Sequence, residues 1–400
     1  MAWNWPFARR TTRVDSRQAD IKPAEMKSTP GFVALHMDGE ARWTRRDYAG
    51  LAREGFMRNP VAHRCVRLVT EAAAGMPWLL YQGGEALTEH PLLALLARPN
   101  PRQSGGALME ALYGHMLIGG NAYLEFTEAS LTGAGVAARE LHALRPDRAA
   151  IVEDSAGWPV AVDYRAGSAK RRIPLGAEPG PGALHLSLFH PLDDHYGFAP
   201  VEAASMALDV HNAAGRWNKA LLDNSARPSG ALVYAPKDGG NLTDEQFDRL
   251  KAELEENYAG ARRAGRPLVL DGDLDWKAMG LTPKDMDFIE AKNGAARDIA
   301  LACGVPPMLL GIPGDNTYAN YQEANRAFWR LTVLPMVGRT AGELSNWLSA
   351  KFGEELRLWY DADQVDGAAA DRDALWRRVG AADFLTDDEK REAVGYGRRG

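Results

Sequence analysis

The densest group of side chains that could do chemistry lies between residues 185 and 195. Its potential metal ligands are His185, His190, Asp193, Asp194 and His195, and imidazole and carboxylate groups are common ligands of catalytic zinc. They are not placed as an i, i+4 pair on a helix, so the pattern favours hydrogen bonding around a turn. We expect no resident metal, and a metal-dependent hydrolase that uses this cluster stays an alternative.

Other catalytic signatures are missing from the sequence. It contains no P-loop, no GxSxG serine, no HExxH helix and no CxxC pair. Asp271, Asp273 and Asp275 have the odd-position spacing of a calcium-binding loop, but Trp276 and Thr282 stand where that loop needs glycine and glutamate. We therefore expect neither an enzyme nor a cofactor.

Composition and charge narrow the class of protein. The 400 residues include 46% hydrophobic and 25% charged residues, as in an ordinary globular chain of two or three domains. The 47 basic and 53 acidic side chains give a formal charge of −6, which argues against tight binding to a phosphate backbone. Cys65 and Cys303 are too few for a metal framework. No stretch has the pattern of an export signal or a membrane span, and we expect neither.

The first half has the mixed pattern of an α+β domain. Residues 1–42 show no sustained period, which predicts an arm. Asn59 and Pro60 form the N-cap and first-turn proline of a helix that ends at Gly75. Later apolar runs predict a strand at 77–81, helices at 90–96 and 107–116, and strands at 122–126, 141–144, 151–152 and 161–164.

The second half is dominated by helices around a small insertion. A helix over 200–227 would be about 40 Å long. Its apolar face begins with Val201, Ala204 and Leu208 but continues through small and polar residues. An apolar stripe this narrow is not typical of a helix in a conventional core, so we expect this helix to pack against neighbours of another kind. A returning helix over 284–303 follows the insertion.

The insertion, residues 228–283, is predicted to be a compact α/β unit. Thr243 and Gln246 form a capping box at the start of its helix, and strands are predicted at 230–235, 267–270 and 274–279. Arg262, Arg263 and Arg266 lie in the turn after that helix and could contact phosphates or an acidic protein surface. Seven basic and ten acidic residues give the unit a net charge of −3, which favours a protein interface over DNA.

A turn-rich loop precedes the last long helix. Residues 311–318, GIPGDNTY, are dense in turn formers. Asn320 then opens, in capping-box fashion, a helix about 30 residues long, which Pro335 should kink. Two short helices are predicted near the C-terminus, one over 371–379 and one capped by Thr386.

This order of elements resembles the portal proteins of tailed bacteriophages, in particular the HK97-like type. The resemblance covers most of residues 55–350, and the order and spacing of the matching strings are more specific than any one string. The strings are NPVAHRCVRL (59–68), HLSLFHPLDDHYGFAP (185–200), ARPSGALVY (226–234), WKAMGLTPKDMDF (276–288), VPPMLLG (305–311) and NTYANYQEAN (316–325). The compact length is also similar to the portals of bacterial gene transfer agents.

The resemblance implies a ring, usually of twelve subunits, at one vertex of a capsid, through which a packaging motor drives double-stranded DNA. The chain would then divide into an N-terminal arm (1–42), a wing (43–199 and the kinked helix 320–350), a two-helix stem (200–227 and 284–310), a small α/β clip (228–283), a tunnel loop (311–319) and a short helical crown (351–400). The packaging ATPase would be another protein, since no nucleotide motif occurs here.

The resemblance also implies partners. The clip would dock the terminase large subunit and later a head-completion or adaptor protein, and the ring would contact the major capsid protein, with no membrane involved. The clip side chains that would carry this docking are Thr243, Arg249, Arg262, Arg263 and Arg266. The protein would assemble in the bacterial cytoplasm and reside in a virion or a gene transfer agent particle.

The tunnel loop would meet the DNA directly. Its residues are Ile312, Pro313, Gly314, Asp315, Asn316, Thr317 and Tyr318. We expect Ile312 and Tyr318 to present apolar or aromatic surface while Asp315 repels phosphate. Twelve copies at −6 each would carry about −72, so the lumen would release few counterions and DNA could slide. For the loop, the alternative is an ordinary surface turn. For the whole protein, a further alternative is a capsid or tail scaffold that assembles without handling DNA.

Overall fold

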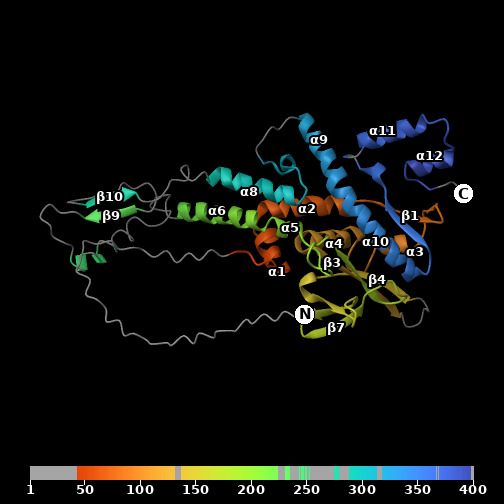
Figure 1. Cartoon of the computed structure of the whole chain (residues 1–400), viewed down its shortest axis with the longest axis horizontal. Coiled ribbons are helices and arrows are strands. Elements are labelled where there is room, and N and C mark those ends of the chain that lie inside the picture. Colours follow the sequence, from red (N-terminus) through yellow and green to blue (C-terminus); the bar gives the residue numbers. More distant parts are fainter. Residues whose placement is uncertain are drawn as a thin grey trace, which may run out of the picture.

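Two helices project side by side from a body of helices and small sheets, and a two-stranded antiparallel sheet lies beyond their outer ends (Figure 1). These are α6 (Ser205–Asp223), α8 (Phe288–Ala302) and the sheet of β9 (Gly230–Tyr234) and β10 (Leu274–Ala278). The computed structural model describes residues 43–130, 137–223, 230–234, 274–278, 288–312, 318–365, 367 and 369–397, together with residues 243, 245, 246, 248, 249 and 252. The expected α+β class is confirmed.

The body is built around α2 (Pro60–Ala74) and α4 (Gly105–Gly119), which pack against each other. Asn59 caps α2 because its Oδ1 accepts hydrogen bonds from the N–H groups of Val61 and Ala62, both at 3.0 Å. The other described helices are α1 (Tyr48–Gly50), η1 (Leu51–Met57), α3 (Pro91–Ala97), η2 (Pro146–Arg148), α5 (Pro200–Ala203), η4 (Pro307–Leu310), α9 (Tyr318–Phe328), η5 (Trp329–Val333), α10 (Leu334–Phe352), η6 (Ala362–Gln364), α11 (Ala369–Gly380) and α12 (Asp387–Ala393). None of them is both long and apolar enough to span a bilayer.

The strands form small antiparallel sheets. Their orders are β11–β1–β2, β4–β3–β8 and β5–β6–β7 in the body, and β10–β9 beyond the projecting helices. The bounds are β1 (Trp78–Gln82), β2 (Glu85–Leu87), β3 (Asn121–Ser130), β4 (Ala137–Leu144), β5 (Ala149–Glu153), β6 (Pro159–Ala166), β7 (Ala169–Pro174), β8 (Gly182–Ser187) and β11 (Leu356–Tyr360). Four of these strands, β2, β7, β8 and β11, are not among those predicted from the sequence. In β7 the reason is plain: it reads AKRRIP and buries only Ile173.

The main hydrophobic core lies between α2, α4, β3 and the long helix α10. Its fully buried side chains include Leu112 and Tyr113 from α4, Leu124 from β3, and Val337 and Leu344 from α10. Burial of side chains of this size contributes about 2 kcal/mol each before losses of conformational entropy. This core fixes the base from which α6 and α8 project.

The last long helix begins at Tyr318, two residues before the predicted start, and continues to Phe352 as α9, η5 and α10. Pro335 has no N–H to donate, and in a regular α-helix its ring would clash with the carbonyl of Leu331. The π turn η5 relieves this clash, because the N–H of Leu334 bonds the carbonyl of Trp329, five residues back. The structure places a π turn just before Pro335, and the kink stays a prediction.

The helix predicted over 200–227 is interrupted near its start. Ala204, with φ −84° and ψ 4°, separates α5 from α6, so the prediction of one unbroken helix is wrong. Residues 224–227 lie outside the described residues, and so do residues 284–287 at the predicted start of the returning helix. Both helices nevertheless run side by side as expected (Figure 1).

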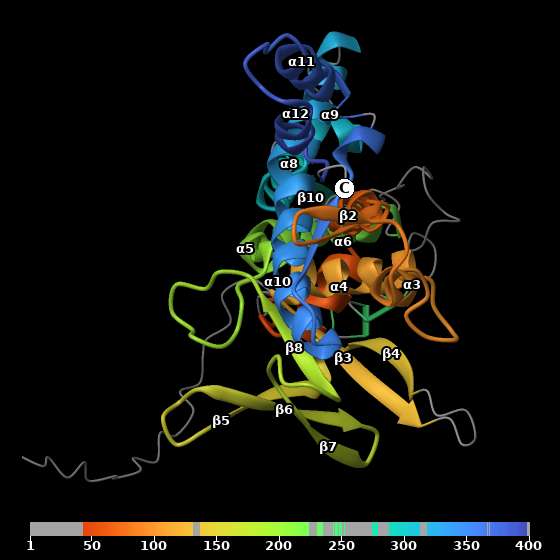
Figure 2. The ribbon, with the colours of Figure 1, turned by 90° about the vertical axis from the view of Figure 1, so that its right-hand side faces the viewer.

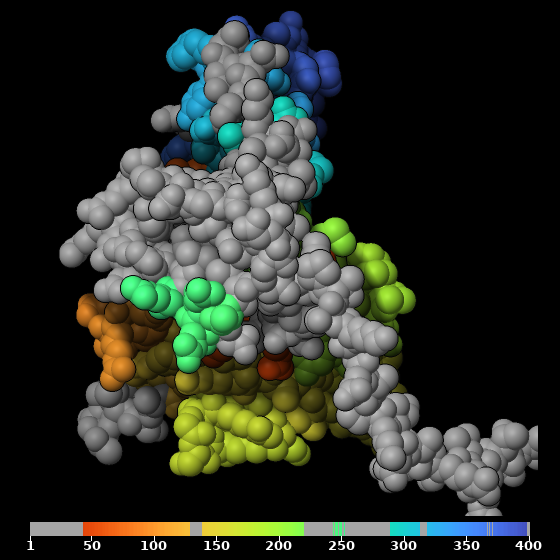
Figure 3. Space-filling view, turned by 90° about the vertical axis from the view of Figure 1, so that its left-hand side faces the viewer, coloured from red at the N-terminus to blue at the C-terminus, as the bar shows by residue number. Residues whose placement is uncertain are grey.

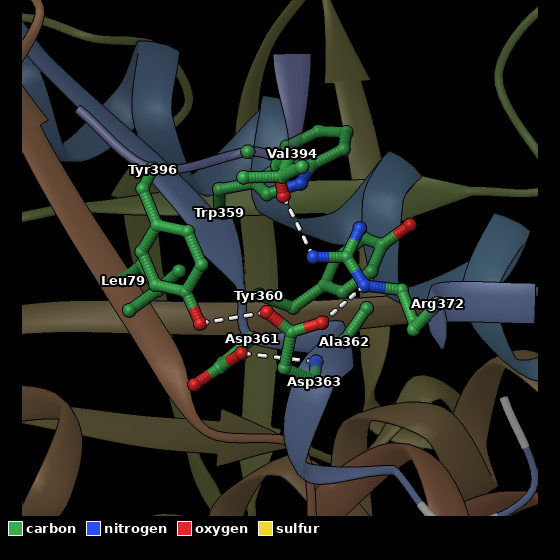
Figure 4. A pocket seen from close by; sticks show the side chains of 10 residues that line it. Leu79, Trp359, Tyr360, Asp361, Ala362, Asp363, Arg372, Val394 and Tyr396 are labelled. Atoms are coloured by element: carbon green, nitrogen blue, oxygen red, sulfur yellow. Dashed lines mark hydrogen bonds and ion pairs between the residues drawn. The ribbon is translucent and has the colours of Figure 1, made fainter. Parts of the chain in front are cut away.

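The C-terminal residues form two short helices that dock beside β11 through a polar cluster (Figure 4). The Asp363 carboxylate accepts a hydrogen bond from the Tyr396 hydroxyl at 2.7 Å and pairs with Arg372. Arg372 Nη2 also donates to the Val394 carbonyl at 2.7 Å. These contacts, the Arg372 guanidinium first, lower the pKa of Asp363. The predicted caps Thr386 and Glu389 form a capping box at the start of α12.

Candidate functional site

The outward face of α5 and α6 carries an apolar stripe with no partner among the described residues. Its members are Ala203, Met206, Val210 and Ala213, spaced by three, four and three residues, which is the spacing of a helix–helix packing seam. Met206 is 68% exposed. The opposite face, with Leu208, is buried against the body and α8, and Ala214, which borders the stripe, is buried as well. We define these four residues as the stem stripe.

Two apolar side chains of α8 also lie in water, Ile289 near the start of the helix, on the same face as Ala296, and Leu301 near its end. Ile289 and Leu301 are both largely exposed. A Cβ added at Gly294, between them in sequence, would meet no atom within 4 Å. The inward face buries Ala296 and Ile299. The two projecting helices thus pack against each other, and each still leaves apolar side chains exposed.

The polar residues that interrupt the inward stripe of α6 fasten the helix to the body. Asn59 Nδ2 donates to Asn212 Oδ1 at 3.0 Å and lies 3.1 Å from His211 Nδ1. Asn212 Nδ2 in turn donates to the Glu54 carbonyl at 2.9 Å. Burial, followed by the charge of Lys292, lowers the pKa of His211, which favours the neutral ring. The apolar stripe predicted from the sequence is therefore weak because polar residues at this position hydrogen-bond α6 to the body.

The predicted tunnel loop lies between η4 and α9. Gly311 ends η4 in the left-handed conformation, with φ 71°. Ile312 is only 8% exposed, and its N–H bonds the Pro307 carbonyl at 3.3 Å, so the expectation that Ile312 presents apolar surface is wrong for the isolated subunit. Tyr318 is 78% exposed at the start of α9, as expected. The loop residues Pro313, Gly314, Asp315, Asn316 and Thr317 lie outside the described residues.

The predicted clip is described in part. Its strands β9 and β10 pair antiparallel, with Leu232 opposite Trp276. The capping box is present: Thr243 N–H donates to Gln246 Oε1 at 3.0 Å, and Gln246 N–H donates to Thr243 Oγ1 at 3.3 Å. Thr243 and Arg249 are exposed. Arg262, Arg263 and Arg266 lie outside the described residues, as does the strand predicted at 267–270.

The histidine and aspartate cluster acts in hydrogen bonding around a loop. His185 stacks on Tyr123 with ring centres 4.4 Å apart, and its Nε2 lies 3.0 Å from Asn121 Oδ1. Burial lowers the pKa of His185 to about 4. Asp193 Oδ1 accepts from the N–H groups of His195 and Tyr196. Among the described residues, no three His, Cys, Asp or Glu side chains converge as metal ligands.

The comparisons with known proteins agree with the order of these elements. A family model described as phage portal protein matches residues 60–395. The chain belongs to the phage portal protein family. The portal protein of Enterobacteria phage HK97 is 25% identical over 202 residues, which cover 49% of this chain and 46% of that protein. The HK97-like resemblance expected from the sequence is therefore confirmed.

Relatives with higher identity come from a bacterium and from gene transfer agent particles. An uncharacterised protein of Rickettsia bellii (strain RML369-C) is 41% identical over 86% of this chain and 88% of its own length. A structure of the neck of an empty gene transfer agent particle, with C6 symmetry, shares 50% identity at a TM-score of 0.67 and covers 90% of this chain and 96% of that one. The neck of a native particle, with C12 symmetry, shares 51% identity at a TM-score of 0.65, over 90% of this chain and 97% of that one.

The portal-type elements are visible in the sequence, but the stem stripe is not among the features predicted from it. Its signal was present, because Ala203, Met206, Val210 and Ala213 alternate at three and four residues. Two of the four are alanines, and alanine is common on both buried and exposed helix faces. Only the packing of the opposite face against α8 shows that this face is left uncovered.

Proposed function

We propose that this chain is the subunit of a ring-shaped portal at one capsid vertex, through which double-stranded DNA is packaged and released. The observation that carries the proposal is the stem stripe, an apolar helix face that the subunit does not bury itself. Membership in the portal family supports the assignment. The gene transfer agent necks with C6 and C12 symmetry support an assembly of several copies.

Physical chemistry favours a closed head-to-tail ring over a free subunit. Apolar side chains in contact with water cost about 25 cal/mol for each Å² left exposed. A head-to-tail contact that closes after a full rotation buries the same face in every copy. Met206 and Val210 of one copy would pack on α8 of the next, near the exposed Leu301. We propose twelve copies.

The channel would pass DNA without holding it. The chain has a formal charge of −6, so a lumen lined by it offers little counterion release to the phosphate backbone. The exposed ring of Tyr318 and the carboxylate of Asp315 would face the duplex at the tunnel loop. The buried side chain of Ile312 would anchor the start of this loop to the body. The protein would act as a structural channel and not as an enzyme.

The partners follow from the ends of the channel. The clip, with Thr243, Arg249, Arg262, Arg263 and Arg266, would dock the terminase large subunit during packaging and a head-completion or adaptor protein afterwards. The wing would contact the major capsid protein. The particle is a virion or a gene transfer agent particle, assembled in the bacterial cytoplasm, and the identity to particle necks supports the second.

The first test is the shape and mass of the purified chain. Electron microscopy of the isolated protein viewed end-on should show a ring with a central hole wide enough for a duplex, and native mass spectrometry should give a whole multiple of 43.7 kDa. Twelve copies is the expected multiple. A chain that stays monomeric at every salt and protein concentration would overturn the proposal.

The second test separates a DNA channel from a scaffold that handles no DNA. Replacing residues 313–317 by two glycines should leave the ring intact, yet particles should package or retain much less nuclease-protected DNA. The matched control replaces residues 131–136, between β3 and β4 of the wing, by two glycines. Normal DNA content after the tunnel-loop replacement would favour the scaffold.

A further inference from the structure

We infer that a rigid loop on one flank of the subunit, residues 188–198, docks on a turn on the opposite flank of a second copy, residues 98–103. This inference rests on the proposed ring and names a contact within it. We call the two segments the flank loop and the arginine turn. The flank loop supplies apolar and acidic groups, and the arginine turn supplies Arg98 and Arg102.

The flank loop is held at its base by close backbone packing. Gly197 lies so near Gly120 that a Cβ on either residue would come within 2.1 Å of the other's carbonyl oxygen. Asn121 Oδ1 accepts from the Gly197 N–H at 2.8 Å, and the Leu188 N–H bonds the Gly120 carbonyl at 2.8 Å. Asp193 closes the tip by accepting from two N–H groups. The loop therefore has one preorganised shape.

The outer surface of this rigid loop is apolar. Phe189 is 79% exposed and Leu192 is 91% exposed. The loop packs beside the β5–β6 hairpin, because the Tyr196 hydroxyl accepts from the Ile151 N–H at 3.0 Å, and Trp158 in that hairpin is also largely exposed. A preorganised element that keeps apolar side chains in water is suited to docking, since little conformational entropy is lost on binding.

Acidic side chains surround this apolar surface. Asp193 and Asp194 lie at the tip, and Glu153 and Asp154 lie in the neighbouring hairpin. His195 Nε2 lies 3.2 Å from Glu153 Oε1 and links the two segments. Asp194 is exposed and has no hydrogen bond or ion pair with any described residue. A docking partner should therefore bring positive charge.

The arginine turn offers that charge on an equally rigid backbone. Asn100 Nδ2 donates to the Leu141 carbonyl at 2.9 Å, and Asn100 Oδ1 accepts from the Arg102 N–H at 3.0 Å. Arg98 and Arg102 are both exposed, and neither forms an ion pair within the described part of the chain. Two unpaired guanidinium groups on a fixed turn complement the acidic rim of the flank loop.

The two segments lie on opposite flanks of the subunit. Seen along the long axis from one end, the flank loop and α5 lie to the left of α10, and α3 with the turn after it lies to the right (Figure 2). The view from the other end places the same colours on exchanged sides (Figure 3). In a head-to-tail ring, opposite flanks of neighbouring copies meet. The flank loop also leads directly into α5, so its surface continues into the stem stripe.

A charge-reversal cycle tests this contact. Asp194→Arg and Arg102→Asp should each raise the protein concentration needed for half-maximal ring formation by about tenfold, measured by mass photometry. The double variant should recover to within about threefold of wild type, because the opposite charges are restored. Asp383→Arg with Arg378→Asp, two exposed residues near the C-terminus, is the control and should change nothing.

The apolar part of the contact has its own variant. Leu192→Ser should weaken ring formation, whereas Phe384→Ser, at a similarly exposed side chain outside the flank loop, should not. If wild type forms rings and the Asp194→Arg and Leu192→Ser variants form them equally well, the inference is overturned. The proposed function is then unaffected. Normal rings that fail to enter particles would overturn it too, and would assign the flank loop to the capsid protein. A wild-type chain without rings would contradict both proposals.

Discussion

Asn59 joins two helices through one side chain. Its Oδ1 caps α2, and its Nδ2 reaches Asn212 and His211 on α6. The side chain is almost fully buried. Both ends of the amide are therefore used, and water cannot replace the partners that would be lost.

Asn59→Ala should lower the free energy of unfolding by about 2–4 kcal/mol, because it removes a helix cap and leaves polar groups of α6 buried without partners. Urea unfolding followed by circular dichroism measures this. Asn59→Asp is the matched variant: it keeps the cap but sets a carboxylate oxygen against Asn212 Oδ1 in a buried place, so its loss should be at least as large. A much smaller loss for Asn59→Asp would show that the cap matters more than the link to α6.

Two buried histidines make stability depend on pH. Burial lowers the pKa of His115, whose Nδ1 lies 2.7 Å from the Tyr48 hydroxyl, and that of His185, each to about 4. In the unfolded chain a histidine titrates near 6.5. Between these values the unfolded state binds more protons, so the free energy of unfolding falls as pH falls from about 6.5 to about 4, and these two groups change nothing further below that.

Lowering the pH from 7 to 5 should therefore cost about 2 kcal/mol for each of these histidines, measured as the change in urea unfolding free energy. His115→Gln should remove about half of the drop that the pair produces. His142→Gln, at a half-buried position on β4, serves as the control and should keep the full drop. A pH dependence unaltered in His115→Gln would contradict the assignment.

At the scale of elements, the end of α8 is fixed against the π turn η5. Gly304 follows α8 with φ 66°, and a Cβ there would lie 2.7 Å from Thr332 Oγ1. Thr332 Oγ1 donates to the Gly304 carbonyl at 2.6 Å. The π turn that accommodates Pro335 thus also positions the side chain that holds the stem.

Gly304→Ala should destabilise the subunit by about 2–4 kcal/mol, through both left-handed strain and overlap with Thr332. Gly311→Ala isolates the strain, because Gly311 has φ 71° and open space around its Cα. It should cost about 1–2 kcal/mol. Thr332→Ala in the Gly304→Ala background should recover the difference. Thermal unfolding compares the variants, and equal costs at the two glycines would argue against a close contact.

At the scale of the whole molecule, assembly should depend on the stem stripe more than folding does. Val210→Glu places a charge on the outward face of α6, where it stays hydrated in the free subunit but would be buried in a ring. Its urea midpoint should match wild type, and its ring population should fall at least tenfold by native mass spectrometry. Phe384→Glu is the control. Rings that survive Val210→Glu would exclude the stripe as an interface.

Local chemistry in the sequence determined where elements begin and end. Asn59 with Pro60, Thr243 with Gln246, and Thr386 with Glu389 all cap helices as predicted, because a cap acts within four residues of its own backbone. Glycines that end helices, and the short strings that resemble portal proteins, are also local signals that can be recognised in the sequence. Membership in the portal family was also visible in the sequence, since it depends on the order and spacing of such signals.

Only the tertiary structure decided which surfaces are buried and which segments meet. Ile312 is buried although its loop is rich in turn formers, and β11 pairs with β1 from the other end of the chain. His211 and Asn212 fasten the stem instead of weakening it. The flank loop and the arginine turn lie on opposite sides of the body (Figure 2). Burial and pairing depend on neighbours that are distant in sequence, and no local pattern of residues encodes those neighbours.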